Sequence, residues 1–136
     1  MKKGNIVIDL KDLKIKKTPK TPEINFNGEN GELIILGISI PENAVEFYAP
    51  AINWLKRYVK HPAKNTKLSF KLAYVNTSSL QTLYEMLFML DELNKKTNSI
   101  IINWYYFFDD DDMRELGEDL EEALSISFNF CIVEDV

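Results

Sequence analysis

The sequence predicts a single α/β domain built on a mixed β-sheet. Some segments alternate with period two, which predicts strands, and others carry apolar residues every three or four positions, which is typical of helices. Their order is strand, strand, helix, strand, helix, strand, helix, strand. Strands separated by helices pair in parallel through crossover connections. A length of 136 residues with 46% hydrophobic residues suits one core.

The N-terminal part of the chain differs from the rest in charge. Seven lysines and no arginine precede Thr21, and the prolines that follow Thr18 and Thr21 favour extended backbone. We therefore expect a basic extended lead-in over residues 1–20, with a strand-like pattern at Ile6–Leu10, and a single domain over residues 21–136.

A β-hairpin is predicted at the start of this domain. Residues Glu23–Asn27 alternate, Glu32–Ile40 is strongly apolar, and Asn27–Gly31 between them reads NGENG. Glycine and asparagine tolerate the positive φ angles of hairpin turns, so the two strands should pair in antiparallel fashion.

A helix is predicted next, because apolar residues recur at helical spacing between Val45 and Val59. Asn43 is a suitable N-cap, His61-Pro62 ends the pattern, and Pro50 should produce a kink or two joined helical pieces. The two adjacent apolar stripes are Val45, Tyr48, Ile52, Leu55 and Val59, and Phe47, Ala51, Trp54 and Tyr58.

The centre of the chain combines a strand with a second helix. Thr66–Val75 alternates, which predicts a strand with its apolar residues on one face. From Leu80 to Leu93 apolar residues recur in steps of three and four, which predicts a helix. The apolar face of the strand comprises Leu68, Phe70, Leu72 and Tyr74, and the helix carries one stripe of Leu80, Leu83, Leu87 and Leu90 and a second of Tyr84 and Phe88.

The C-terminal third supplies two more strands and a helix. Ile100–Phe108 is nearly all apolar, which suits a central strand covered on both faces. Asp109–Asp112 opens an acidic segment that should be helical to about Leu124, since acids in a first turn face the positive end of the helix dipole. Alternation from Ile126 to Ile132 predicts the last strand.

Charge and composition exclude several functional classes. The net charge of -5 argues against general nucleic-acid binding. The single cysteine, Cys131, excludes an internal disulfide and fits a reducing compartment. We see neither a secretory h-region nor an apolar run of membrane-spanning length, so we expect a cytoplasmic protein with no membrane insertion.

Three hydroxyls stand where the central strand gives way to its helix, in Asn76-Thr77-Ser78-Ser79. The first backbone N–H groups of a helix have no partner within it and donate to a side-chain oxygen or an anion. The hydroxyls can therefore be plain caps, with Asn76 shaping the junction, or one can accept a phosphoryl group. An anion- or nucleotide-binding module at this helix start is the alternative.

Catalytic machinery is not evident. The only histidine, His61, precedes Pro62 in a polar loop, and there is no Gly-x-Ser-x-Gly elbow, so a Ser or Thr hydrolase lacks a base. The run Asp109–Asp112 lacks the spaced ligands and the glycine of a calcium loop. We expect neither enzyme activity nor a cofactor or metal.

Several blocks of sequence, taken together in their order and spacing, resemble one family. The blocks are Thr18–Phe26, Gly31–Ala44, Phe47–Pro50, Tyr74–Ser79, Trp104–Tyr106 and Asp109–Asp119. From about Leu13 to its C-terminus, the chain resembles the SiaC family of bacterial regulatory phosphoproteins. The resemblance implies a fold similar to STAS domains, the class of the anti-sigma-factor antagonists.

The resemblance also implies a site. In such domains a Ser or Thr at the start of the helix after the third strand is phosphorylated by a dedicated kinase, and a PP2C-type phosphatase removes the phosphate. By position the acceptor here is Thr77, with Ser78 and Ser79 as caps or alternative acceptors.

A non-catalytic, partner-switching role follows from the resemblance. The unmodified form of the family binds and activates a downstream partner, which is a diguanylate cyclase in the best-understood systems. The helix from Leu80 to Leu93 would contribute the docking surface, with Tyr84 and Phe88 as contacts.

Overall fold

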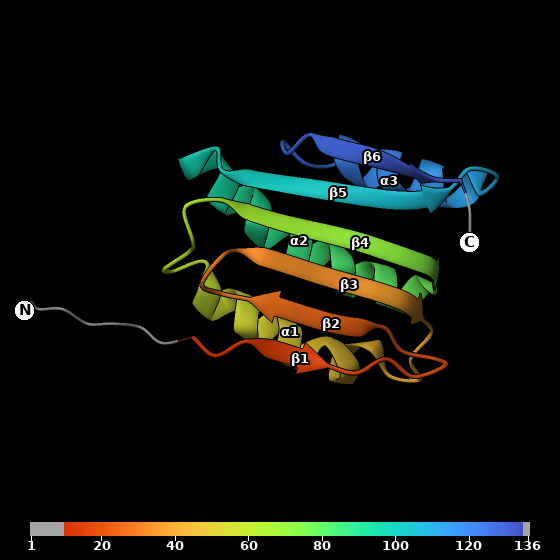
Figure 1. Cartoon of the computed structure of the whole chain (residues 1–136), viewed down its shortest axis with the longest axis horizontal. Helices are drawn as coiled ribbons and strands as arrows, with labels where there is room; N and C mark the ends of the chain where they lie inside the picture. The colour runs from red at the N-terminus through yellow and green to blue at the C-terminus, as the bar shows by residue number, and fades with distance from the viewer. Residues whose placement is uncertain (1–9, 135–136) are drawn as a thin grey trace, which may run out of the picture.

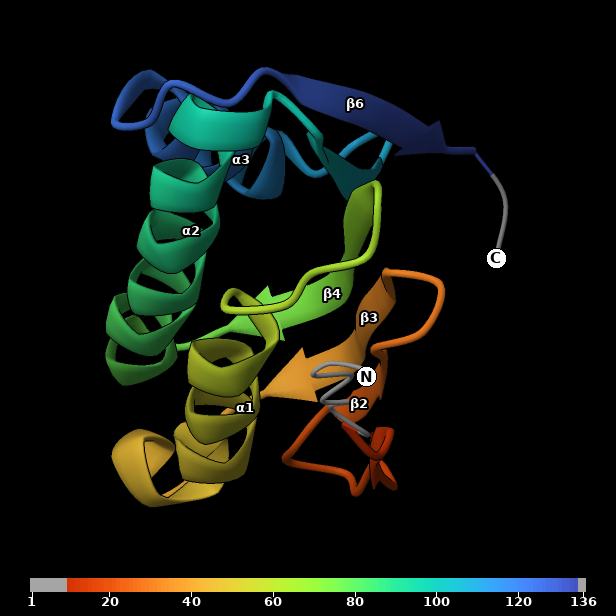
Figure 2. The ribbon, with the colours of Figure 1, turned by 90° about the vertical axis from the view of Figure 1, so that its left-hand side faces the viewer.

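In the part of the chain that the structure describes, six strands form one mixed sheet, and three helices cover one of its faces (Figures 1 and 2). The computed structural model describes residues 10–134. The strands lie in sequence order across the sheet. The elements are β1 (Leu13–Ile15), β2 (Glu23–Asn27), β3 (Glu32–Ser39), α1 (Ala44–Tyr58), β4 (Thr66–Val75), α2 (Thr77–Thr97), β5 (Ile100–Phe107), α3 (Asp111–Glu122) and β6 (Phe128–Val133).

The predicted hairpin is confirmed. β2 and β3 pair in antiparallel fashion, with Asn27 opposite Glu32. Gly31 closes the turn at a φ of 75°, and an added Cβ there would lie 2.2 Å from the carbonyl oxygen of Asn65. Glycine is therefore required at this position both by the backbone angle and by the lack of space.

The predicted crossovers are confirmed as well. β3 and β4, β4 and β5, and β5 and β6 pair in parallel, and each of these three connections passes through one helix. The side chain of Asn43 accepts from the backbone N–H of Glu46 and caps α1, as predicted. The helix continues through Pro50 as one element, so of the two predicted outcomes the division into two pieces is wrong, and the kink stays a prediction. Pro50 gives up one backbone donor without ending the helix.

All three helices lie on the same face of the sheet (Figure 2), and the core fills the space between them. The prediction that Ile100–Phe108 is covered on both faces is therefore wrong. Trp104 on the helix side is 1% exposed, whereas Ile101 on the other side is 40% exposed. A nearly continuous apolar run suggests two covered faces, but here one face of the strand stays open.

The two edges of the sheet differ in length and charge. β1 falls within the expected lead-in, and the sequence analysis does not predict it; it is three residues long, carries Lys14 and pairs with β2. At the other edge, β6 is six residues long and reads FNFCIV, without a charged side chain. The strand-like pattern at Ile6–Leu10 lies outside the described residues, apart from Leu10, which is in no strand.

The predicted helices and strands of the C-terminal third form with shifted limits. α3 ends at Glu122 rather than Leu124, and the last strand begins at Phe128 rather than Ile126. This α/β arrangement is compatible with the predicted likeness to STAS domains, which stays a prediction. Within residues 10–134, none of the helices has the length and apolar character needed to cross a bilayer.

Candidate functional site

Asn76 organises the junction between β4 and α2. Its Oδ1 accepts a hydrogen bond of 2.9 Å from the backbone N–H of Ser79 and one of 3.3 Å from the Ser78 hydroxyl. Its own N–H donates to the carbonyl oxygen of Ser39, at the end of the neighbouring strand. The structure thus gives the capping role to Asn76 rather than to Ser78 or Ser79. This cap leaves the hydroxyl of Thr77 free of any capping bond.

The three consecutive hydroxyls differ in exposure. Thr77 and Ser78 are exposed, whereas Ser79 is 0% exposed. The difference follows from the helix, because residues two positions apart project in directions about 200° apart. Of these three residues, only Thr77 and Ser78 therefore expose their hydroxyl to solvent.

Ser79 belongs to a buried chain of hydroxyls. The Ser39 hydroxyl donates to Ser79 Oγ at 2.8 Å and lies 2.6 Å from the Tyr48 hydroxyl. Burial raises the pKa of Tyr48 to about 12, and its hydrogen bonds to Ser39 and Ser79 act more weakly in the opposite direction. These bonds fix the start of α2 to the end of β3 and to α1. The backbone that carries the exposed hydroxyl of Thr77 is therefore held in place.

The first turn of α2 contains no acidic residue. The first turn of α1 contains Glu46, and that of α3 contains Asp111 and Asp112. A helix start carries about half a positive charge from its aligned peptide dipoles. Of these three helix starts, that of α2 therefore has no acidic side chain to compensate its positive charge.

An aromatic pair lies on the same face of α2 as Thr77. Tyr84 and Phe88 follow Thr77 by seven and eleven positions, which are near multiples of the helical repeat. Their side chains are 40% and 48% exposed, and their ring centroids lie 6.4 Å apart. The residues that the sequence analysis selects thus form one exposed stripe, which we call the Thr77 stripe: Thr77, Tyr84 and Phe88.

Tyr74 adds an exposed aromatic ring close to the junction. The alternation of β4 predicts that Tyr74 shares the apolar face of Leu72, but Tyr74 is 57% exposed and lies outside the buried part of that face. The register between β3 and β4 shifts at Gly37, and Tyr74 then pairs with Ile38, which is also exposed. A single sequence carries no signal for this shift beyond the glycine itself.

Sequence reasoning also misses Ser39 and Tyr48. Both lie in predicted elements, but nothing in the pattern shows that they meet Ser79. The available signal is topological, since β3 and β4 are parallel neighbours and both end at this edge.

The acidic run is used locally as a helix start. Asp110 caps α3 by accepting from the backbone N–H of Met113, and Arg114 lies 3.2 Å from Glu118 and 3.7 Å from Asp111. Within residues 10–134, three or more His, Cys, Asp or Glu side chains do not gather into a possible metal site.

Comparison with known families assigns the class of the protein. Residues 15–133 match a model of regulatory phosphoproteins, so the match covers most of the chain. The model is that of the SiaC family, and the chain belongs to this family. A protein of Pseudomonas aeruginosa strain UCBPP-PA14, PA14_02130, is 30% identical over 119 residues, which cover 88% of this chain and 94% of that protein.

Two solved structures extend the comparison to the fold. Apo-SiaC from Pseudomonas aeruginosa is 31% identical, with a TM-score of 0.78 over 91% of this chain and 99% of that one. SiaC in complex with the diguanylate cyclase SiaD, which it activates, is 29% identical, with a TM-score of 0.84 over 90% of this chain and 100% of that one. The predicted family and the predicted mixed α/β fold are thus confirmed.

Proposed function

We propose that this SiaC family regulatory protein is a non-catalytic, partner-switching adaptor of the cytoplasm whose switch is reversible phosphorylation of Thr77. A dedicated Ser/Thr kinase adds the phosphate and a PP2C-type phosphatase removes it. The unmodified form binds and activates a downstream diguanylate cyclase. The observation that carries the proposal is the exposed Thr77 hydroxyl at an uncompensated helix start, on the same face as an exposed aromatic pair.

The fold tolerates a phosphate at this position. A phosphate adds about -1.5 to -2 charges and three strong acceptors. The positive end of the α2 dipole favours that charge, and no carboxylate in the first turn opposes it. Phosphorylation therefore need not unfold α2, and its effect falls on whatever docks against the surface.

The Thr77 stripe explains how the charge would act on a partner. Tyr84 and Phe88 offer apolar area, and burying it stabilises a complex. A phosphate on the same face would have to lose water on docking, at a cost of several kcal/mol unless it is paired. A complete switch between 1:99 and 99:1 needs about 5.5 kcal/mol, a size within reach of a desolvated phosphate.

The choice of partner comes from the relatives. Pseudomonas aeruginosa SiaC is described as the activator of the diguanylate cyclase SiaD. The chain covers nearly all of that protein at 29% identity, so we assign the same kind of partner.

Four variants of Thr77 test the switch. The diguanylate cyclases of the source cell are expressed singly, and their affinity for each variant is measured by calorimetry. We expect Thr77→Ala and Thr77→Gln to bind like the wild type, Thr77→Glu to bind about tenfold more weakly, and phosphothreonine installed at residue 77 to bind about a hundredfold more weakly. Equal affinity of the phosphorylated and unmodified proteins for a bound cyclase would overturn the switch.

Intact mass of the protein purified from its own cells tests the modification itself. One phosphate should map to Thr77 and disappear in Thr77→Ala. Phosphate on Ser78 alone would move the switch by one residue. Absence of phosphate together with tight binding of inorganic phosphate or a nucleotide at Asn76–Ser79 would favour the alternative, an anion-binding module.

The docking role of the aromatic pair needs its own control. Tyr84→Ala and Phe88→Ala should each weaken cyclase binding by about tenfold, as exposed anchors at an interface do. Phe108→Ala removes an even more exposed aromatic ring that follows β5 and is not part of α2, and should leave binding unchanged. Loss of binding in Phe108→Ala, with unchanged binding in both α2 variants, would move the docking surface from α2 to the end of β5.

A further inference from the structure

The sheet parts between β4 and β5. Their backbone pairing runs from Thr66 opposite Ile100 to Phe70 opposite Trp104, and then stops. Beyond that point β4 continues through residues 71–75 beside β3, and β5 continues through residues 105–107 beside β6. Each strand therefore keeps its outer neighbour while the two facing edges are unpaired with each other.

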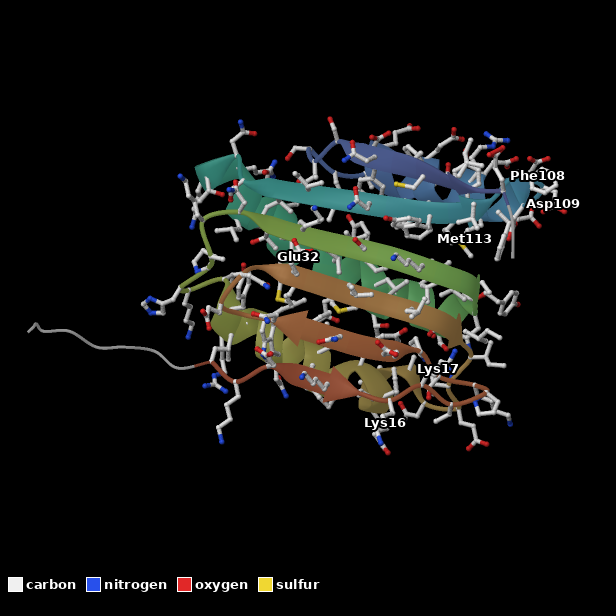
Figure 3. All side chains as sticks on the ribbon, in the orientation of Figure 1. Lys16, Lys17, Glu32, Phe108, Asp109 and Met113 are labelled. Carbon is white, nitrogen blue, oxygen red and sulfur yellow. The ribbon has the colours of Figure 1, made fainter. Side chains whose placement is uncertain are left out.

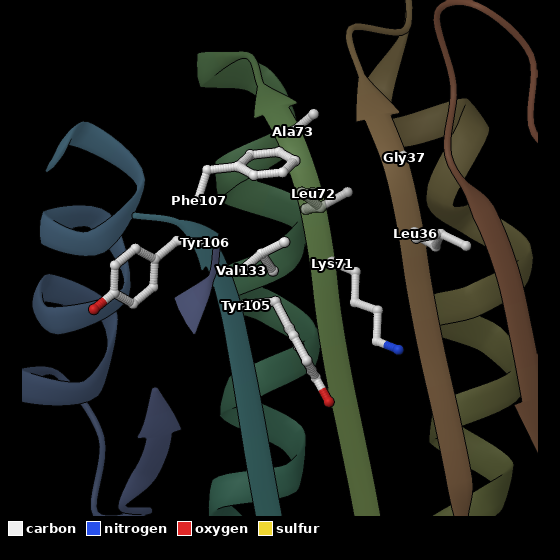
Figure 4. A pocket seen from close by; sticks show the side chains of 9 residues that line it. All are labelled: Leu36, Gly37, Lys71, Leu72, Ala73, Tyr105, Tyr106, Phe107 and Val133. Atoms are coloured by element: carbon white, nitrogen blue, oxygen red, sulfur yellow. The ribbon is translucent and has the colours of Figure 1, made fainter. Parts of the chain in front are cut away.

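A cavity of about 300 Å³ occupies the place where these strands separate (Figure 4). We call it the β4–β5 cleft. Its walls are mainly apolar, and they come from both unpaired segments and from the outer strands on either side. Leu36, Ala73, Tyr105, Phe107 and Val133 contribute to them. Binding sites for small molecules begin at about this volume and have this mainly apolar character.

The open face changes its chemistry where the strands part. Where β4 and β5 pair, polar side chains link neighbouring strands. Asn103 Nδ2 of β5 donates to Ser69 Oγ of β4 at 3.4 Å, and Asn129 Nδ2 of β6 donates to Asn103 Oδ1 at 3.1 Å. Beyond the last pair the lining is apolar apart from Lys71 and the tyrosine hydroxyls. The apolar area is thus concentrated at the cleft rather than spread over the face.

One cation and no carboxylate line the cleft. The ammonium of Lys71 lies 4.7 Å from the centroid of the Tyr105 ring, and it forms no ion pair with residues 10–134. Lys67, four residues earlier on the same face of β4, lies 3.9 Å from Glu32. The charge of Lys71 is therefore the one left for a ligand, and a ring already holds it in place.

We propose that the β4–β5 cleft binds a small amphiphilic carboxylate, whose apolar ring or short acyl chain packs against Ala73, Phe107 and Val133 while its carboxylate pairs with Lys71. The unpaired backbone edges of β4 and β5 offer further N–H donors to the carboxylate. The assignment stands on the cleft alone and does not depend on phosphorylation of Thr77.

A ligand in this cleft would also bear on the switch. The β4 wall continues from Ala73 through Tyr74 and Val75 to Asn76 and Thr77. A ligand that orders this unpaired end of β4 would order the strand that carries the proposed phosphorylation site. That regulatory consequence rests on the proposed function, whereas binding itself does not.

The test is a titration of the isotope-labelled full chain with 4-phenylbutyrate, followed by amide NMR. We expect saturable shifts at residues 71–73 and 105–107 with a dissociation constant of about 1 mM, the range for a ligand of this size. Lys71→Met should weaken binding about fivefold, as loss of one exposed ion pair does. Ala73→Phe, which fills the cleft from an exposed position, should abolish the shifts.

Matched controls separate this site from general binding. Lys67→Met removes a lysine from the same face and strand outside the cleft, and should leave the dissociation constant unchanged. 4-Phenylbutylamine, the cationic twin of the probe, should bind at least fivefold more weakly than the carboxylate. The NMR spectrum of α1 in Ala73→Phe shows whether that variant is folded.

Several outcomes would overturn the assignment. They are the absence of saturable shifts at 10 mM probe (roughly ten times the expected constant), equal binding of the amine, unchanged binding by the folded Ala73→Phe, and shifts at the cleft that depend on protein concentration without any probe. The last result would mean that a second copy of the chain covers the cleft. None of these outcomes touches Thr77, so a failed titration leaves the proposed function standing.

Discussion

The starts of α2 and α3 are built alike and charged differently. Each helix follows a parallel strand, and each is capped by a residue with a short side-chain oxygen, Asn76 for α2 and Asp110 for α3. The first turn of α3 then holds two aspartates, whereas the first turn of α2 holds hydroxyls and no acid. Figure 3 shows Asp109 and Met113 together at the corner of the molecule where α3 begins.

The difference teaches where this fold can accept more negative charge. At α3 the helix dipole is already compensated, so another anion would meet carboxylates. At α2 the dipole is free, and the neighbouring hydroxyl of Ser79 is locked away in a bond to Ser39. The two helix starts also differ in their anchors, since α3 is held by the Trp104 indole, which donates to the carbonyl oxygen of Met113 at 2.9 Å.

The largest expected effect comes from disrupting the packing of α3 against the sheet. A Cβ added at Gly117 would lie 2.5 Å from Cδ1 of Trp104 and 2.9 Å from Cε1 of Phe130. Trp104 is buried and hydrogen bonded, so it has no room to yield. Gly117→Ala should lower the free energy of unfolding by about 2–3 kcal/mol in urea titrations. Gly28→Ala is the control, because its Cβ would approach Trp54 only to 3.3 Å. Equal stability of both variants would mean that α3 can shift without cost.

The next effect breaks the anchor of α2. Ser79→Ala leaves the Ser39 hydroxyl without its acceptor in the core, which should cost about 1–2 kcal/mol of unfolding free energy. Ser78→Ala, one residue earlier and exposed, should change stability by less than about 0.5 kcal/mol. Should the two variants prove equally stable, the buried hydroxyl chain does not hold the helix start.

The same anchor predicts a loss of stability at high pH. The pKa of Tyr48 is about 12 in the folded protein, against 10.0 for an ordinary tyrosine. The folded state therefore retains this proton more tightly, so its contribution to stability is full below pH 10 and falls as the pH rises toward 12. The unfolding free energy of the wild type should decline more steeply than that of Tyr48→Phe, by up to about 1.4 kcal/mol per pH unit. Parallel pH profiles would contradict this.

The smallest expected effect comes from changing the charge at the two helix starts themselves. Thr77→Asp should stabilise the fold by about 0.5 kcal/mol relative to Thr77→Asn, because it supplies the missing charge at the α2 dipole. Asp111→Asn should destabilise by a similar amount at α3. Both differences should shrink in 1 M salt, where the screening length is about 3 Å. A destabilising Thr77→Asp would show that α2 does not tolerate the charge.

Much of the fold is predictable because strands and helices leave their periods in the sequence. The hairpin, the crossovers and the cap at Asn43 follow from local rules. β1 escapes because three residues among lysines leave no readable period, and β2 supplies the pairing that holds it. The open face of β5 escapes because an apolar run looks the same whether one face or two are covered.

The junction between β4 and α2 is predictable from the sequence, but the arrangement of its side chains is not. The three consecutive hydroxyl residues 77–79 mark this junction in the sequence. Only the three-dimensional arrangement separates exposed Thr77 from buried Ser79. The register shift at Gly37 and the parting of β4 from β5 depend on how whole strands fit together, which no short segment encodes.

The uncharged outer strand β6 makes the two sides of the molecule unequal toward other chains. Lysine on short β1 makes strand addition there unfavourable, whereas the backbone of β6 is six residues long and has no charge to repel a newcomer. Growth of the sheet by a foreign or misfolded segment is therefore directed to one side alone. A lysine in place of Asn129 would be the simplest way to protect concentrated samples.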